Sequence, residues 1–175
     1  DDHIARRVRS YINLCFGKSD RYLHEDIGYN FRMTSMQAAL GNSQLSRLDS
    51  IVEKKRSIGL IYKKYLSEDK SLQLQIQLDN VISVYWMYCV VLPNKGKIFR
   101  DTVQERLLNL GIETRSFFTG MHQQPALSGL NIAGAFPVTE YLSSNGFYLP
   151  SSQTLEDADV KEICHNLHKV IAETS

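Results

Sequence analysis

The stretch that decides the fold is LQLQIQLDNVISVYWMYCVVL, residues 72–92. Its first seven residues alternate apolar side chains with glutamine, which is the period of a strand that buries one face. Ser83 to Leu92 is dense in valine, tyrosine and tryptophan, which favours a strand buried on both faces. We therefore predict two strands here, with Tyr85, Trp86 and Tyr88 in the core of the second.

Three helices and a further strand are predicted after this stretch. Residues 100–110 have a helical pattern that Gly111 closes, and residues 112–118 read as a strand. A short helix is expected over 136–144 and an amphipathic helix over 154–172. This order of elements predicts an α+β fold, with a small, mostly antiparallel sheet and helices on one of its faces.

The N-terminal part is predicted to be helical, with a loop between two helices. Apolar residues recur at helical spacing from Ile4 to Phe16, and Gly17 ends the pattern. A polar loop follows over 18–29. Thr34 and Gln37 then have the spacing of a capping box, and no proline interrupts the chain from there to Leu66. We predict one helix of roughly 30 residues, about 45 Å long.

This long helix changes character along its length, which predicts a domain boundary. Its first half is apolar on more than one side, whereas its second half is amphipathic. Such a helix is expected to start inside one domain and to leave along the surface of another. We therefore predict that residues 1–45 end a first domain and that residues 46–175 form a second, smaller one.

Composition narrows the classes of function. Twenty basic and nineteen acidic residues give a net charge of +1, so nucleic acid is not an expected partner. The sequence has no apolar run long enough for a membrane span, and none is predicted. Three separated cysteines without a CxxC pair favour a reducing, cytoplasmic setting. The first residue is Asp1, which suggests that a longer protein has lost an upstream part.

Few side chains indicate chemistry by spacing alone. Cys164, His165 and His168 fall within one helical turn, but a structural zinc site needs four ligands, so no metal site is predicted. His122 lies in a predicted loop between Gly120 and Pro125, where side chains can line a cleft, although a single loop histidine is more often a bystander. From residue patterns alone, the sequence predicts a globular α+β domain and little more.

The segment DIGYNFRMTS, residues 26–35, raises a sharper question. Asn30 and Arg32 stand between aromatic residues just before the capping box. One interpretation is a plain helix start, in which Asn30 bonds its own backbone and Arg32 faces water. The other is a phosphate site, because an amide and a guanidinium both donate hydrogen bonds to oxyanions.

GYNFRMTSMQAALGNSQLSRLD, residues 28–49, resembles the signature of the DegT/StrS family of pyridoxal-phosphate-dependent nucleotide-sugar aminotransferases. The similarity continues through KKRSIGLIYKKYL, VYWMYCVVLP, GIETRSFFTGMHQQPAL and the closing section from Phe136, in the family's order. Within the family, the YWMY and FF-x-x-MH segments are most similar to the perosamine-synthetase-like branch. The resemblance implies aminotransferase fold type I, represented here by the end of the large domain, a long interdomain helix and the small domain.

The resemblance also implies that the lysine forming a Schiff base with pyridoxal phosphate lies upstream of this chain. Lys18 is the only lysine before the predicted long helix, and it lacks the family's glycine-rich neighbour, so the role is not transferred to it. The chain is thus expected to be the C-terminal part of an aminotransferase, inactive alone, with no catalytic residue of its own.

For the complete enzyme, the resemblance implies transfer of an amino group from glutamate to a nucleotide-linked 4-keto-6-deoxyhexose, in polysaccharide or antibiotic-sugar biosynthesis. Two subunits of a homodimer would share each active site. Asn30 and Tyr29 are implied to bind the cofactor of the partner subunit, and Arg32, Phe31 and His122 the substrate. Gly120 stands where the family often has proline, which leaves the shape of the His122 loop open.

Two other classes of function remain open from the sequence. One is a non-catalytic module that dimerises or regulates through its long helix. The other is a nucleotide-sugar-binding protein that retains Arg32 and His122 without chemistry.

Overall fold

A computed structural model describes residues 1–17, 22–130 and 132–174. The chain forms two compact units, Asp1–Leu48 and Asp49–Ser175, which are described separately. Lys18, to which the role of the Schiff-base lysine is not transferred, lies outside the described residues. In the described part of the chain, no helix has the length and apolar character needed to cross a membrane.

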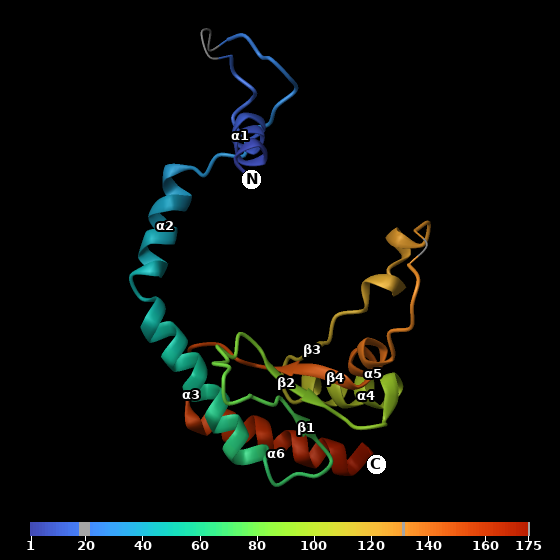
Figure 1. Ribbon diagram of the computed structural model, residues 1–175. Helices are drawn as coiled ribbons and strands as arrows, with labels where there is room; N and C mark the ends of the chain where they lie inside the picture. The colour runs from blue at the N-terminus through green and yellow to red at the C-terminus, as the bar shows by residue number, and fades with distance from the viewer. Residues whose placement is uncertain (18–21, 131, 175) are drawn as a thin grey trace. The chain divides into compact units, whose positions relative to one another are not determined.

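The second unit is built on a four-stranded antiparallel sheet (Figure 1). Its strands are β1 (Gln73–Leu74), β2 (Tyr88–Val91), β3 (Arg115–Ser116) and β4 (Gly146–Leu149), in the order β1-β2-β4-β3. The register pairs Tyr88 with Leu149 and Val90 with Phe147. Because side chains alternate along a strand, these four point to the same face of the sheet.

Helices α3 (Leu48–Leu66), α4 (Gly96–Asn109) and α6 (Asp157–Thr174) bury that face. Each helix supplies fully buried side chains to a single core, among them Tyr62 of α3, Leu107 of α4 and Leu167 of α6. Burying one such side chain stabilises the fold by about 1.5–3 kcal/mol. The predicted α+β class, with an antiparallel sheet and helices on one face, is confirmed.

The strands are shorter than the sequence patterns predict. The glutamine-rich strand predicted over 72–78 is reduced to the two residues of β1, which pairs only with β2 at the sheet edge. Tyr85 has a left-handed backbone with φ 43°, which interrupts the extended chain, so β2 begins only at Tyr88. Tyr85 and Tyr88 are buried, but Trp86 is 69% exposed and its prediction as strand core was wrong.

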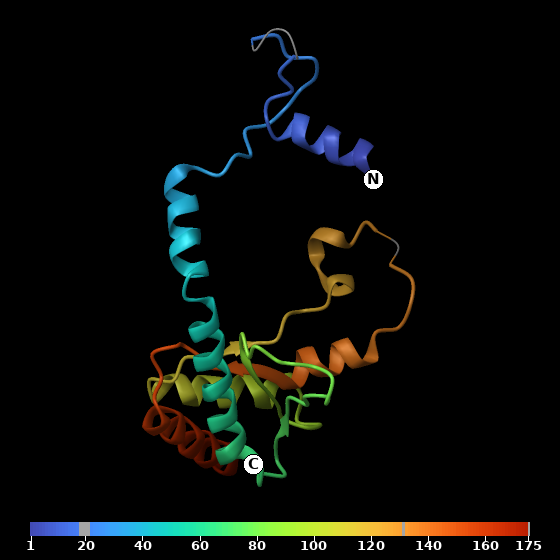
Figure 2. The ribbon, with the colours of Figure 1, turned by 60° about the vertical axis from the view of Figure 1, so that its left-hand side comes forward.

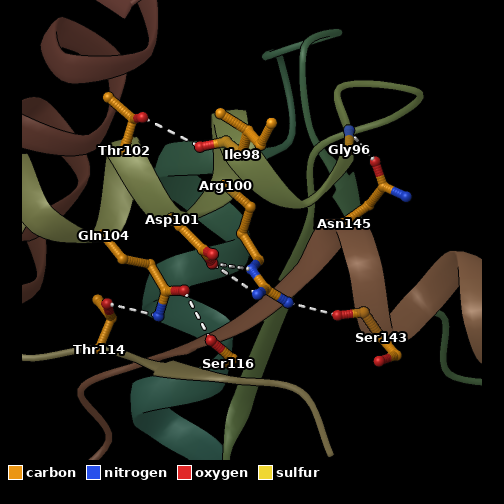
Figure 3. Close-up of polar contacts among 10 residues, drawn as sticks. All are labelled: Gly96, Ile98, Arg100, Asp101, Thr102, Gln104, Thr114, Ser116, Ser143 and Asn145. Atoms are coloured by element: carbon orange, nitrogen blue, oxygen red, sulfur yellow. Dashed lines mark hydrogen bonds and ion pairs between the residues drawn. The ribbon is translucent and has the colours of Figure 1, made fainter. Parts of the chain in front are cut away.

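Polar contacts fasten α4 to the elements around it (Figure 3). The buried guanidinium of Arg100 donates to Asp101 and to the backbone oxygen of Ser143 in α5 (Pro137–Asn145). The buried Asn145 accepts a bond of 2.7 Å from the backbone N–H of Gly96. These bonds satisfy polar groups that would be costly to leave unpaired in the interior.

The segment between β3 and α5 carries two short 3₁₀ helices, η1 (Met121–Gln123) and η2 (Pro125–Leu127). Figure 2 shows residues 117–130 extending away from the sheet. The chain just before this segment is bonded to α4, because the Gln104 side chain bonds the hydroxyls of both Thr114 and Ser116, at 3.1 and 2.9 Å (Figure 3).

The first unit contains α1 (Asp2–Tyr11) and α2 (Ser35–Leu45). The prediction that the first helix continues to Phe16 was wrong: the helix ends at Tyr11, and the backbone of Leu14 and Cys15 adopts positive φ angles. The predicted capping box at the start of α2 is confirmed. The Thr34 hydroxyl accepts from the Gln37 N–H, and the Gln37 side chain accepts from the Thr34 N–H.

The single long helix predicted from Thr34 to Leu66 is wrong in one respect, because it is divided into α2 and α3 at Ser46 and Arg47. Both side chains donate to the backbone oxygen of Ser43, and the Arg47 N–H bonds Gln44 rather than a residue four positions back. Local side-chain bonds of this kind compete with the helical ladder, and serine is a residue that forms them readily. Ser46 is therefore a sequence signal for the break, but the lack of proline in this stretch led to the prediction of one continuous helix.

Candidate functional site

The segment around Asn30 lies against the chain that follows α1. Backbone bonds join Tyr29 to Tyr11 and to Leu14, and Phe31 to Ile12. Gly28 permits this approach, because a Cβ atom at residue 28 would lie 2.5 Å from the backbone carbon of Leu14. The chain that follows α1 thus holds the signature segment in an extended form. It approaches so closely that only glycine fits at residue 28.

Alternation along this extended segment separates aromatic from polar side chains. The rings of Tyr29 and Phe31 stack with centroids 5.2 Å apart and an interplanar angle of 4°. Asn30 and Arg32 alternate with them, and Arg32 Nε donates a bond of 2.9 Å to Asn30 Oδ1. The structure therefore brings together the four residues that sequence analysis placed at this site, all of them exposed.

The polar side of the segment is rich in hydrogen-bond donors. Asn30 Oδ1 is occupied by Arg32, which leaves the Asn30 NH₂ group and the two terminal nitrogens of Arg32 to meet a ligand. In the described part of the chain, no carboxylate or carbonyl is bonded to these remaining donors. Such a set fits an oxyanion such as a phosphate, since the ligand supplies all of the acceptors.

A second polar cluster adjoins the signature segment. The Tyr11 hydroxyl accepts a bond of 2.8 Å from Arg7 and donates one of 2.9 Å to Asp26. The backbone N–H of Ile27 and this hydroxyl lower the pKa of the Asp26 carboxyl. Asp26 is therefore a stable anion with its own partners, and it bonds neither Asn30 nor Arg32.

His122 belongs to the other unit and lies in η1, with its side chain 16% exposed. Its Nε2 lies 3.0 Å from Glu140 Oε1, and its ring stacks on Phe136 at 4.5 Å. A Cβ atom at residue 120 would lie 2.6 Å from the ring, so Gly120 makes room for the histidine. The imidazole is held by its own loop and by α5, and a ligand could reach only its small exposed part.

Two cavities in the second unit were not anticipated from the sequence. The larger, of about 690 Å³, is lined in part by Val84, Trp86 and Met87, and the smaller, of about 430 Å³, by Arg115 and Tyr148 among others. Lys55 borders the larger one, and burial lowers the pKa of its ammonium. None of the predicted site residues lines either cavity.

The described residues hold no cluster of three or more histidine, cysteine or acidic side chains suited to a metal. Of the three residues that suggested one, Cys164 is buried and His165 is exposed. His168 instead lies 3.1 Å from Asp69.

Comparison with known proteins identifies the family. The sequence profile described as the DegT/DnrJ/EryC1/StrS aminotransferase family matches residues 1–168. The chain belongs to this family. GDP-perosamine synthase of Vibrio cholerae is 37% identical over 145 residues, which are 83% of this chain and 39% of that protein. The enzyme of the same name from Caulobacter vibrioides is 30% identical over 172 residues, 98% of this chain and 46% of that protein.

Solved structures of aminotransferases share the fold. The aminotransferase TlmJ of Streptoalloteichus hindustanus matches with a TM-score of 0.86 at 25% identity, covering 99% of this chain and 46% of that one. A protein of Streptococcus pneumoniae described as a sugar aminotransferase, solved in a PLP form, matches with a TM-score of 0.89 at 19% identity, covering all of this chain and 45% of that one. The prediction of aminotransferase fold type I is confirmed. The chain spans less than half the length of these relatives.

Proposed function

We propose that this chain is the C-terminal part of a pyridoxal-phosphate-dependent aminotransferase that aminates a nucleotide-linked 4-keto-6-deoxyhexose, with glutamate as amino donor. The family match and the resemblance to GDP-perosamine synthases support the reaction class. The assignment of the first unit to the large domain and of the second to the small domain belongs to the same proposal, as does a role in surface-polysaccharide or antibiotic-sugar biosynthesis.

The observation that carries the proposal is the set of donors on the polar side of the signature segment. Asn30 would bind the cofactor phosphate through its NH₂ group, and Arg32 would bring positive charge to the sugar diphosphate of the substrate. Tyr29 and Phe31, whose rings stack on the other side of the segment, would flank the cleft. When bound, pyridoxal phosphate supplies the electron sink and carries the amino group, while the protein supplies binding and orientation.

We further propose a homodimer with shared active sites, and the surface of the first unit supports it. An exposed run of large apolar side chains includes and follows the signature segment: Tyr29, Phe31, Met33, Met36, Leu40 and Leu45. Each is at least half exposed, and apolar surface gathered in this way marks a protein–protein contact. We propose that the upstream part of the large domain and a second subunit together cover it, so that Asn30 reaches the partner's cofactor.

The roles of the remaining predicted residues follow from their surroundings. His122 could contact the sugar through the exposed edge of its ring, because Glu140 occupies Nε2. Among the described residues the cysteines are free thiols, as the proposed reducing, cytoplasmic setting requires.

Subunit mixing tests the proposal in the longer protein that contains this chain. One variant carries Asn30→Ala, and the other lacks the cofactor-anchoring lysine of the upstream part. Each should be weakly active or inactive alone. In a mixed dimer, one of the two shared sites combines an intact lysine with an intact Asn30. Since half of the dimers in an equimolar mixture are mixed, about a quarter of the wild-type activity should return.

The readout is glutamate-dependent amination of a GDP- or dTDP-linked 4-keto-6-deoxyhexose. Mixing two preparations of the same variant is the matched control and should restore nothing. If verified mixed dimers recover no activity, the shared-site proposal is wrong. If the wild-type protein aminates none of these keto sugars, the proposed reaction is wrong.

A further inference from the structure

We propose that Arg32 is a positioning residue, which acts on the cofactor phosphate by fixing the amide of Asn30. This inference deepens the proposed function and rests on it. A guanidinium beside a phosphate invites a simpler interpretation, in which Arg32 binds the anion directly. The hydrogen bond within the segment favours an indirect contribution.

The direction of that bond determines the orientation of the Asn30 amide. Arg32 Nε can only donate, so the atom 2.9 Å away must be the amide oxygen and not the amide nitrogen. Rotating the amide by half a turn would bring two donors face to face. Arg32 thereby fixes which side of the Asn30 amide carries the oxygen and which carries the nitrogen. An isolated exposed asparagine has no partner that distinguishes the two orientations.

The backbone supports this arrangement. Asn30 forms an isolated β-bridge with Asn13, and the neighbouring N–H of Phe31 bonds the Ile12 oxygen at 3.1 Å. With the segment extended, residues 30 and 32 lie on the same side, which is the geometry their side-chain bond needs. The amide is consequently held by a fixed backbone at one end and by the guanidinium at its oxygen.

The chemical consequence is a pre-oriented donor. With Oδ1 bonded to Arg32, the NH₂ group is the part of the Asn30 amide that is left to bond the phosphate oxygens. The bond also withholds Nε of Arg32 and leaves its two terminal nitrogens free. Without Arg32, the amide would sample both orientations, and only one of them binds a phosphate.

The test uses the longer protein in its cofactor-free form, titrated with pyridoxamine 5′-phosphate and followed by fluorescence. This ligand carries the phosphate but forms no covalent bond to a lysine, so the dissociation constant reports non-covalent contacts. Asn30→Ala should weaken binding about tenfold, the effect of one hydrogen bond to a charged group. Arg32→Ala should weaken it about threefold to tenfold, and the double variant should be no weaker than Asn30→Ala alone.

Two further variants separate positioning from charge. Arg32→Lys keeps the charge but replaces the planar guanidinium, so positioning predicts a loss close to that of Arg32→Ala. Arg6→Ala removes an exposed arginine of α1 and should leave the dissociation constant unchanged. With pyridoxamine, which lacks the phosphate, all variants should bind as the wild type does.

The outcomes distinguish this inference from the proposed function. Multiplied losses in the double variant, or full binding by Arg32→Lys, would show that Arg32 acts directly or through its charge, and would overturn the positioning role alone. The same holds if Asn30→Ala weakens binding and Arg32→Ala does not. If Asn30→Ala has no effect, or if the wild-type protein does not bind the ligand, the phosphate contact and the positioning role both fail.

Discussion

The hydroxyl of Tyr62 provides a sharp test of how the second unit is held together. Tyr62 lies in α3, is fully buried, and donates a bond of 2.7 Å to the backbone oxygen of Pro150, just after β4. Burial raises the pKa of this phenol well above its ordinary value, so the group stays a neutral donor at every pH at which the protein is handled. Tyr62→Phe removes this bond and keeps the ring.

The expected cost follows from what the substitution leaves behind. The ring volume is conserved, so no large cavity forms, but the oxygen of the half-buried Pro150 loses the donor that the buried Tyr62 supplied. A net hydrogen bond with an unsatisfied buried acceptor costs about 1–2 kcal/mol. For a chain of this size, that free energy lowers the melting temperature by about 3–6 °C.

Urea unfolding followed by circular dichroism measures the loss, and Tyr65→Phe is the matched control. Tyr65 lies in the same helix, but its hydroxyl bonds the Asp157 carboxylate at the surface, where water can replace it. The control should cost less than about 0.5 kcal/mol. Equal losses in the two variants, or a stable Tyr62→Phe protein, would show that the buried bond is not the source of the stability.

Two further predictions concern the same core. Gly59→Ala in α3 should destabilise the fold by about 1–3 kcal/mol, because the new Cβ would lie 2.5 Å from the Tyr85 ring. This loss is expected although alanine favours helices. Gly41→Ala in α2 has nothing within 4 Å of the new Cβ, so it should instead raise the helix content seen by circular dichroism. Burial raises the pKa of the Cys164 thiol from 9.0 to about 12, so above pH 9 the unfolded chain loses a proton that the folded chain keeps. The Cys164 thiol should therefore contribute no pH dependence well below pH 9 and a loss that approaches about 1.4 kcal/mol per pH unit above it, so a urea series from pH 8 to 10.5 should show a shallower fall in Cys164→Ala than in the wild type. Identical slopes would contradict the buried-thiol argument.

Local patterns predicted the fold best where one physical preference acted alone. The capping box of Thr34 and Gln37 formed as expected, because its bonds involve only neighbouring residues. The strand predicted from Ser83 begins only at Tyr88. A β-branched and aromatic composition cannot show that the backbone of Tyr85 enters the left-handed region. That turn exposes Trp86 and depends on packing of Tyr85 over Gly59 in α3, which is a tertiary effect.

The candidate site divides in the same way. The resemblance named Tyr29, Asn30, Phe31 and Arg32 together. Their contacts are local, since the polar pair and the aromatic pair each join residues two positions apart. The bond that orients the Asn30 amide could not be read from the sequence, because it depends on an extended backbone that Gly28 makes possible. For His122, the partner Glu140 lies 18 residues away, beyond any local pattern.

The Lys55 ammonium has a consequence for how this part of the protein can vary. It donates to the backbone oxygens of Trp86 and Ser151, two residues 65 positions apart in the chain. One side chain thereby serves two loops. The Ser151 hydroxyl joins them as well, because it accepts from Lys55 at 3.1 Å and donates to the Trp86 oxygen at 3.3 Å. Every residue type possesses the two backbone acceptors, so the paths of the two loops are coupled, and insertions or deletions in either one are constrained by the other.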